Sequence, residues 1–155
     1  MVKLEINYEA EVQSGKVVYN KNDYSFETIG INHVGITSAL FNDVSLELDD
    51  SGKVIYIWGL CPHLGWTAGR LEPPDAMEGE LRLVLEAPLE EGVAIGLTSS
   101  GKRLPTIVDR ENGWVMIGTT STTGYAVSIM DGLMAQITEK GELAALWIRP
   151  ENGID

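Results

Sequence analysis

The chain of 155 residues is 44% hydrophobic, and its 11 basic and 23 acidic side chains give a formal net charge of -12. This charge repels phosphate backbones and anionic lipid surfaces, so we expect neither nucleic acid nor a membrane as a partner. The length suffices for one hydrophobic core and is too short for two, so we expect a single domain over residues 1–155.

The N-terminal residues and the cysteine content predict a cytoplasmic protein. Lys3 and Glu5 interrupt the first residues, which therefore lack the apolar run of a secretory signal. No stretch reaches the roughly 18 apolar residues of a membrane-spanning helix. Cys61 is the single cysteine, which excludes an internal disulfide, and a chain without a signal peptide most simply stays in a reducing compartment.

Clusters of β-branched and aromatic residues follow one another along the chain, with 17 glycines spread between them. This pattern predicts a mainly β fold, either a sandwich or a closed barrel of about 10–12 short strands. In chain order, the predicted elements are strands at 4–8, 16–20 and 24–29, a hairpin at 44–58, strands at 80–86, 93–98, 105–109 and 113–118, and a hairpin at 134–148.

Residues 125–139 fit two secondary structures. Their apolar side chains recur at helical spacing and Gly141 would end a helix, whereas Gly132 in the middle favours a pair of strands. A helix here would make the fold α+β. The apolar positions are Ala126, Ile129, Met130, Leu133, Met134 and Ile137.

A faint internal repeat relates the two halves of the chain. The similarity pairs residues 3–63 with residues 80–152, and it runs without a gap from Gly35 and Gly124 to Trp58 and Trp147. One interpretation is a duplication with pseudo-two-fold symmetry, in which residues 64–79 form a crossover. The alternative is that any two sets of hairpins share glycine turns and apolar strands.

The sequence CPHLG, which begins at Cys61, resembles the first ligand box of a Rieske iron–sulfur centre. Such a centre needs two Cys and two His, and this chain has no second Cys and only one further histidine, His33, which lies upstream. Zinc held by Cys61, His63, His33 and a carboxylate is the alternative metal site. We expect no cofactor, with Trp58 ending a buried strand and Cys61 packed in the turn after it.

The sequence INHVGIT, which begins at Ile31, resembles the opening strand of the glyoxalase and extradiol dioxygenase family. The resemblance implies that His33 binds a metal. The family then requires an amphipathic helix, but here SALFNDV leads into an alternating strand. We therefore expect His33 to be a core residue, hydrogen-bonded to the backbone of its strand.

Two regions are candidate binding surfaces. His63, Trp66 and Arg70 share a long predicted loop, and Trp and Arg are enriched at binding hot spots, so we predict them as binding residues. The stretch from Glu72 to Glu91 contains seven carboxylates and only one basic residue, Arg82. It forms either a solvated face or a surface that attracts a basic partner.

The absence of a complete active-site motif favours a function without catalysis. We expect a binding or assembly module that uses the acidic surface and the loop with Trp66 and Arg70. We also expect it to form homo-oligomers through open strand edges and the apolar sequence AALWI at 144–148. An acidic inhibitor or immunity-type protein with a basic partner protein is one alternative. A small metal-dependent enzyme with His33 or His63 as ligand is the other.

Overall fold

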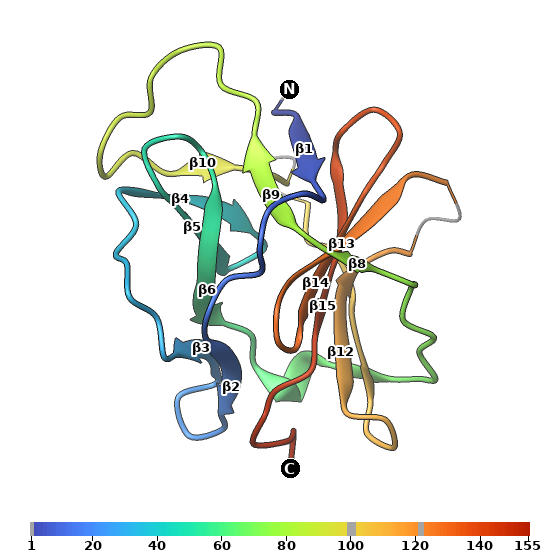
Figure 1. Ribbon diagram of the computed structural model, residues 1–155. Coiled ribbons are helices and arrows are strands. Elements are labelled where there is room, and N and C mark those ends of the chain that lie inside the picture. Colours follow the sequence, from blue (N-terminus) through green and yellow to red (C-terminus); the bar gives the residue numbers. More distant parts are fainter. Residues whose placement is uncertain (1, 99–101, 121–122) are drawn as a thin grey trace.

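Two β-sheets packed face to face form most of the protein, as the computed structural model shows for residues 2–98, 102–120 and 123–155 (Figure 1). The N-terminal sheet contains β2 (Lys16–Asn20), β3 (Ser25–Ile29), β4 (Thr37–Phe41), β5 (Val44–Leu48), β6 (Val54–Leu60) and β10 (Ile95–Gly96). The C-terminal sheet contains β7 (Thr67–Ala68), β8 (Met77–Glu78), β11 (Thr106–Asp109), β12 (Trp114–Gly118), β13 (Tyr125–Met130), β14 (Leu133–Ile137) and β15 (Leu143–Ile148). A third, two-stranded sheet joins β1 (Leu4–Asn7) to β9 (Glu80–Leu83).

The sandwich confirms one of the two predicted β architectures and excludes the closed barrel. The strand orders are β10-β4-β5-β6-β3-β2 in the N-terminal sheet and β7-β11-β12-β15-β14-β13-β8 in the C-terminal sheet, so the two sheets remain separate. The strands predicted at 80–86 and 93–98 are shorter than expected, because β9 ends at Leu83 and β10 has two residues. Within the described residues, no helix is long and apolar enough to cross a bilayer.

The helix considered for residues 125–139 is wrong, because this segment forms the hairpin of β13 and β14. Every residue of β14 is buried, since one face of the strand meets the core and the other is covered. Met134 occupies an outward position of β14 beneath the crossover, so the strand lacks polar alternation, and this is why the apolar spacing resembled that of a helix. Gly132 sits in the turn with φ of 78°, where a Cβ would overlap the carbonyl oxygen of Arg149.

The main core lies between the two sheets and is built from alternating strand positions. Each strand of the N-terminal sheet sends every second side chain inward, as Val44, Leu46 and Leu48 do along β5. The largest fully buried side chains of this core are Phe26, Phe41, Leu46, Leu48, Ile57, Leu81, Leu83, Ile117, Ile129, Met130 and Leu133.

The two sheets share one strand order. The order β4-β5-β6-β3-β2 in the N-terminal sheet corresponds to β13-β14-β15-β12-β11 in the C-terminal sheet. The corresponding hairpins also turn at corresponding places: Phe41 pairs with Val44 between β4 and β5, and Met130 pairs with Leu133 between β13 and β14.

The register between the central strands matches as well. The pairing of β5 with β6 shifts after Glu47, and the pairing of β14 with β15 shifts after Gln136. Matching Glu47 to Gln136 also matches Trp58 on β6 to Trp147 on β15. Each outward position of the N-terminal sheet therefore has an equivalent on the C-terminal sheet.

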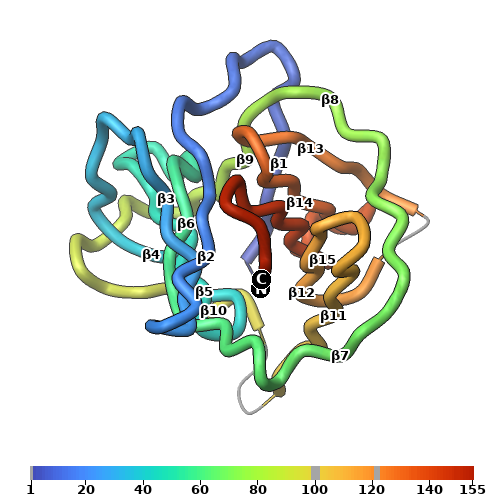
Figure 2. Tube along the Cα trace, turned by 90° about the horizontal axis from the view of Figure 1, so that it is seen from below, coloured from blue at the N-terminus to red at the C-terminus, as the bar shows by residue number. Residues whose placement is uncertain are grey.

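An extended crossover segment covers the outer face of the C-terminal sheet. β7 pairs with β11 at one edge of this sheet and β8 pairs with β13 at the opposite edge, so residues 69–76 run across the face between them (Figure 2). Leu71 of the crossover belongs to one buried apolar cluster with Trp147, and Ala76 packs against this cluster. The N–H of Leu71 donates to Oδ2 of Asp109 at 3.0 Å, and this bond contributes most to holding the pKa of that carboxyl below its usual range.

Candidate functional site

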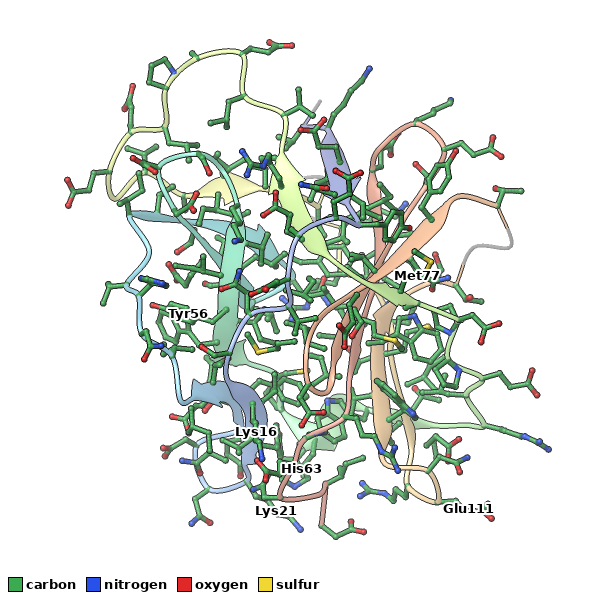
Figure 3. The ribbon with its side chains drawn as sticks, in the orientation of Figure 1. Lys16, Lys21, Tyr56, His63, Met77 and Glu111 are labelled. Carbon is green, nitrogen blue, oxygen red and sulfur yellow. The ribbon has the colours of Figure 1, made fainter. Side chains whose placement is uncertain are left out.

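The outer face of the N-terminal sheet carries an exposed aromatic and apolar surface. The side chain alternation that sends Leu46 and Ile57 inward sends the neighbouring positions outward. Trp58 is 52% exposed and Leu60 is 56% exposed at the end of β6. Figure 3 shows Tyr56 projecting from β6 away from the C-terminal sheet. We define the Trp58 face as the outward residues Glu27, Ser38, Ser45, Glu47, Tyr56, Trp58 and Leu60.

Glu47 lies at the centre of the Trp58 face and holds the indole of Trp58. The indole N–H of Trp58 and the hydroxyl of Ser38 both donate to Oε1 of Glu47, the latter at 2.8 Å. Glu47 is only 7% exposed, and no basic side chain of the described residues forms an ion pair with it. The site therefore holds a nearly buried carboxylate whose partners are neutral donors.

The equivalent tryptophan of the C-terminal sheet has the same partner geometry but is fully covered. The indole N–H of Trp147 donates to Oε1 of Gln136 at 2.8 Å, as that of Trp58 does to Glu47. Trp147 is 1% exposed because Leu71 of the crossover packs on it. The tryptophan at this position is therefore covered on the C-terminal sheet and exposed on the N-terminal sheet.

The side chains around the covered Trp147 differ from those around the exposed Trp58. Around Trp147, the outward positions are filled by Met116, Met134 and Ala145, which form a second apolar cluster beneath the crossover. The equivalent positions of the Trp58 face hold Glu27, Ser45 and Tyr56. Glu27 is exposed, Tyr56 is partly exposed and Ser45 is buried, whereas Met116, Met134 and Ala145 are all buried, so the Trp58 face is the more exposed of the two.

The predicted binding residues His63 and Trp66 come together, but inside an aromatic cluster. His63 stacks on Tyr24 with ring centroids 5.4 Å apart, and Trp66 stacks on Phe26 at 6.1 Å. Tyr19 lies between them, and its hydroxyl accepts the backbone N–H of His63 at 3.0 Å. These contacts fix the short 3-10 helix η1 (His63–Gly65) against the core, so the two rings have structural contacts of their own.

Arg70 does not join the other two predicted binding residues. It lies in the crossover, fully exposed, and its guanidinium is 3.9 Å from the carboxylate of Glu72. The three residues therefore do not form one surface, because the chain leaves η1 and pairs with β11 before Arg70 is reached.

The acidic stretch from Glu72 to Glu91 also does not form one surface. Its first part lies in the crossover over the C-terminal sheet, and its last part lies in the loop between β9 and β10, on the opposite side of Figure 1. Glu80 is 6% exposed and pairs with Lys53 at 3.3 Å and Arg82 at 3.0 Å. Burial acts to raise the pKa of Glu80, but hydrogen bonds from these two cations hold it below its usual range.

His33 is neither a core residue nor part of a strand. It lies exposed in the connection between β3 and β4, and the segment after it forms β4 where the resemblance to the glyoxalase family requires a helix. Among the described residues, no three His, Cys, Asp or Glu side chains come close enough to hold a metal ion. The residues named for a zinc site are therefore not assembled: His33 lies in this connection, and Cys61 and His63 lie beside η1.

Cys61 lies buried directly after β6, as predicted. Trp58 was expected to end a buried strand, but its side chain is exposed. The indole N–H of Trp66 donates to the thiol sulfur at 3.3 Å, and the sulfur borders a cavity of about 330 Å³. Burial raises the pKa of the Cys61 thiol, against the smaller opposing effect of this hydrogen bond.

We expect the folded protein to react slowly with iodoacetamide, because only the thiolate attacks and burial disfavours the thiolate of Cys61. The alkylation rate at pH 8 should be at least about tenfold lower in buffer than in 8 M urea. The inflection of the rate against pH should also lie higher in the folded state. Equal rates and equal inflections in the two conditions would show that the thiol is not shielded by the fold.

Sequence reasoning missed Trp58, Glu47 and Glu27 as site residues. The run VIYIW lacks alternation, so it did not show that Trp58 points outward. A usable signal was present in the internal repeat, whose gapless part places Glu47 opposite Gln136 and Trp58 opposite Trp147. In this alignment both halves have the tryptophan, but Glu47 is charged where Gln136 is neutral.

Comparisons with known proteins do not identify a family for this chain. No family model, no curated protein and no solved structure matches it. The function is therefore inferred from the geometry of the Trp58 face and from its covered equivalent on the C-terminal sheet.

Proposed function

We propose that this protein is a non-enzymatic binding module that holds a partner protein on the Trp58 face. The observation that carries the proposal is the contrast between Trp58, which is 52% exposed, and the equivalent Trp147, which is 1% exposed beneath Leu71. An exposed tryptophan with the exposed Leu60 and Glu27 on the same sheet face has the composition of a protein-binding hot spot. Burial of Trp58 by a partner would reproduce the state in which Trp147 is found.

The partner is a basic protein in this proposal. The formal net charge of -12 attracts basic partners at long range and repels a second copy of the same chain. The acidic inhibitor or immunity-type function considered from the sequence is one form of this proposal, with the contact moved from the acidic stretch at 72–91 to the Trp58 face.

Self-association remains a prediction, and the part of its basis that used the sequence AALWI is wrong. AALWI was expected to form an apolar surface near the chain end, but β15 is a central strand and Trp147 is buried. Among the outermost strands, β7, β8 and β10 have two residues each, and the longer β2 hydrogen-bonds along its edge to Glu151 and Asn152.

Selection of peptides from a random twelve-residue display library tests the proposed function. We expect the strongest binders to lose about thirtyfold in affinity for Trp58→Ala, since a hot-spot truncation costs about 2 kcal/mol or more. Tyr125→Ala is the matched control, because Tyr125 is 58% exposed on the C-terminal sheet and should leave affinity unchanged. Selected peptides that bind wild type and Trp58→Ala equally well would contradict the proposal.

A further inference from the structure

We infer that the ligand of the Trp58 face is an extended peptide segment of the partner, with a lysine or arginine side chain that lies over Trp58 and pairs with Glu47 and Glu27. This inference rests on the proposed function and names the chemistry of the ligand. Three features of the chain carry it: the covered equivalent face, the open carboxylate oxygen of Glu47, and the placement of Glu27.

The covered face shows which backbone conformation fits such a sheet. Residues 69–76 cross the C-terminal sheet as an extended segment without helix, from the edge strand partner β7 to β8. Five strands lie beneath this path, and four interstrand spacings of about 4.8 Å amount to roughly 19 Å. An extended peptide at about 3.3 Å per residue crosses that width in roughly six residues. A short linear segment is therefore long enough to cover the equivalent tryptophan of the N-terminal sheet.

The carboxylate of Glu47 has one oxygen left for a ligand. Both hydrogen bonds to Glu47 end on Oε1. Oε2 accepts none from the described residues and lies beside the backbone of Gly35, and it is not fully buried, because no fully buried side-chain polar atom among these residues lacks a partner. An oxygen of a nearly buried carboxylate without a cation is a favourable acceptor for a charge-assisted hydrogen bond.

The residues that differ between the two sheets point to a cation. Where the covered face has neutral Gln136, the Trp58 face has Glu47, and the adjoining position on β4 has Ser38, whose hydroxyl supports the carboxylate. Ala126 occupies the position of Ser38 opposite Gln136. The charged side chain therefore lies on the Trp58 face, and a neutral one takes its position on the covered face.

Glu27 places a second carboxylate beside Trp58. β3 pairs with β6 through Phe26 and Gly59, and one further step in this antiparallel register brings Glu27 opposite Trp58. The hydroxyl of Thr28 donates to the carbonyl of Ile57 at 2.7 Å, which continues the same register. An indole between two carboxylates attracts a cation both through its π face and through ion pairing.

The chain contains one example of the geometry that we infer. The guanidinium of Arg149 lies 5.9 Å from the ring centroid of Trp114 on the outer side of the C-terminal sheet. Trp114 in turn contacts Trp147 edge to face, with centroids 6.1 Å apart. A basic side chain of the ligand over Trp58 would make the same kind of cation–π contact that Arg149 makes with Trp114.

The test uses the strongest peptide from the display selection and Glu47→Gln. Gln136 shows that glutamine can accept the indole N–H at this position, so the variant should fold and keep Trp58 in place. We expect the selected peptides to carry a Lys or Arg, and its replacement by norleucine to weaken binding to wild type at least tenfold. The same replacement should weaken binding to Glu47→Gln at least threefold less than it weakens binding to wild type, because one of the two carboxylate partners is gone while Glu27 and the indole of Trp58 remain. Glu111→Gln, in the turn between β11 and β12, is the control and should leave every affinity unchanged.

The outcomes separate this inference from the proposed function. Peptides that depend on Trp58 but contain no basic residue, or whose norleucine variants lose the same affinity for wild type and Glu47→Gln, would overturn the basic ligand and leave the binding face intact. Peptides that do not depend on Trp58 would overturn both. Parallel lysine and arginine versions of one peptide show which cation the face prefers.

Discussion

Replacing Trp147 by alanine is expected to lower the free energy of unfolding by about 3–5 kcal/mol, the range for fully buried aromatic side chains. Trp147 is 1% exposed, donates its indole N–H to Gln136 and packs beneath Leu71 of the crossover. Its truncation leaves a cavity beneath the crossover and removes one hydrogen bond to the Gln136 side-chain oxygen. Urea unfolding followed by circular dichroism measures the loss.

Trp58→Ala is the matched control for this prediction, because the two tryptophans occupy equivalent strand positions and bond to equivalent side chains. Trp58 is half exposed, so its truncation should cost about 1 kcal/mol or less. Equal losses for the two variants would contradict the assignment of one covered and one open face. A small loss for Trp58→Ala also shows that its binding defect does not come from unfolding.

Replacing Gly118 by alanine is expected to cost about 3 kcal/mol, since strained φ and overpacking each cost on the order of 1–3 kcal/mol. Gly118 has φ of 103°, a region that residues with a Cβ rarely adopt. A Cβ there would also overlap the carbonyl oxygen of Ala144 on the neighbouring strand β15. Thermal and urea unfolding should both show the loss.

Gly65→Ala is the control for the Gly118 variant. Gly65 ends η1, its φ is not positive, and nothing lies within 4 Å of the position that a Cβ would occupy. The change should therefore alter the free energy of unfolding by about 0.5 kcal/mol or less. Similar losses at both positions would show that the close approach of β12 and β15 is not what requires glycine at position 118.

The sandwich was predictable because strand signals are local. β5 alternates Val44, Leu46 and Leu48 with polar residues, and the turn after it contains Gly52, so the hairpin at 44–58 follows from neighbouring residues alone. The alternation of polar and apolar residues failed as a signal at β14, because Met134 occupies an outward position beneath the crossover and leaves an apolar run that resembles a helix. The internal repeat remains a hypothesis, supported by the matching strand order and register of the two sheets.

The candidate site was predicted poorly because it depends on which faces are covered. Trp66 and Arg70 were chosen by residue type, but packing against Phe26 gives Trp66 a structural role and the crossover carries Arg70 away. His33 was expected inside and lies outside, in a connection between strands. Exposure depends on contacts between residues far apart in the chain, and no local pattern records it.

The sequence by itself determined the strand content and the net charge of -12, and it suggested through the hypothetical repeat that Trp58 corresponds to Trp147. Only the tertiary structure decided that the crossover lies over Trp147 and leaves Trp58 open. The physical reason is that strand formation depends on neighbouring side chains and turns. Whether the outer face of a sheet is buried depends instead on which edge strands pair with a segment that is distant in the sequence. The edges of the C-terminal sheet pair with β7 and β8, and this pairing holds the crossover over one face of the sandwich.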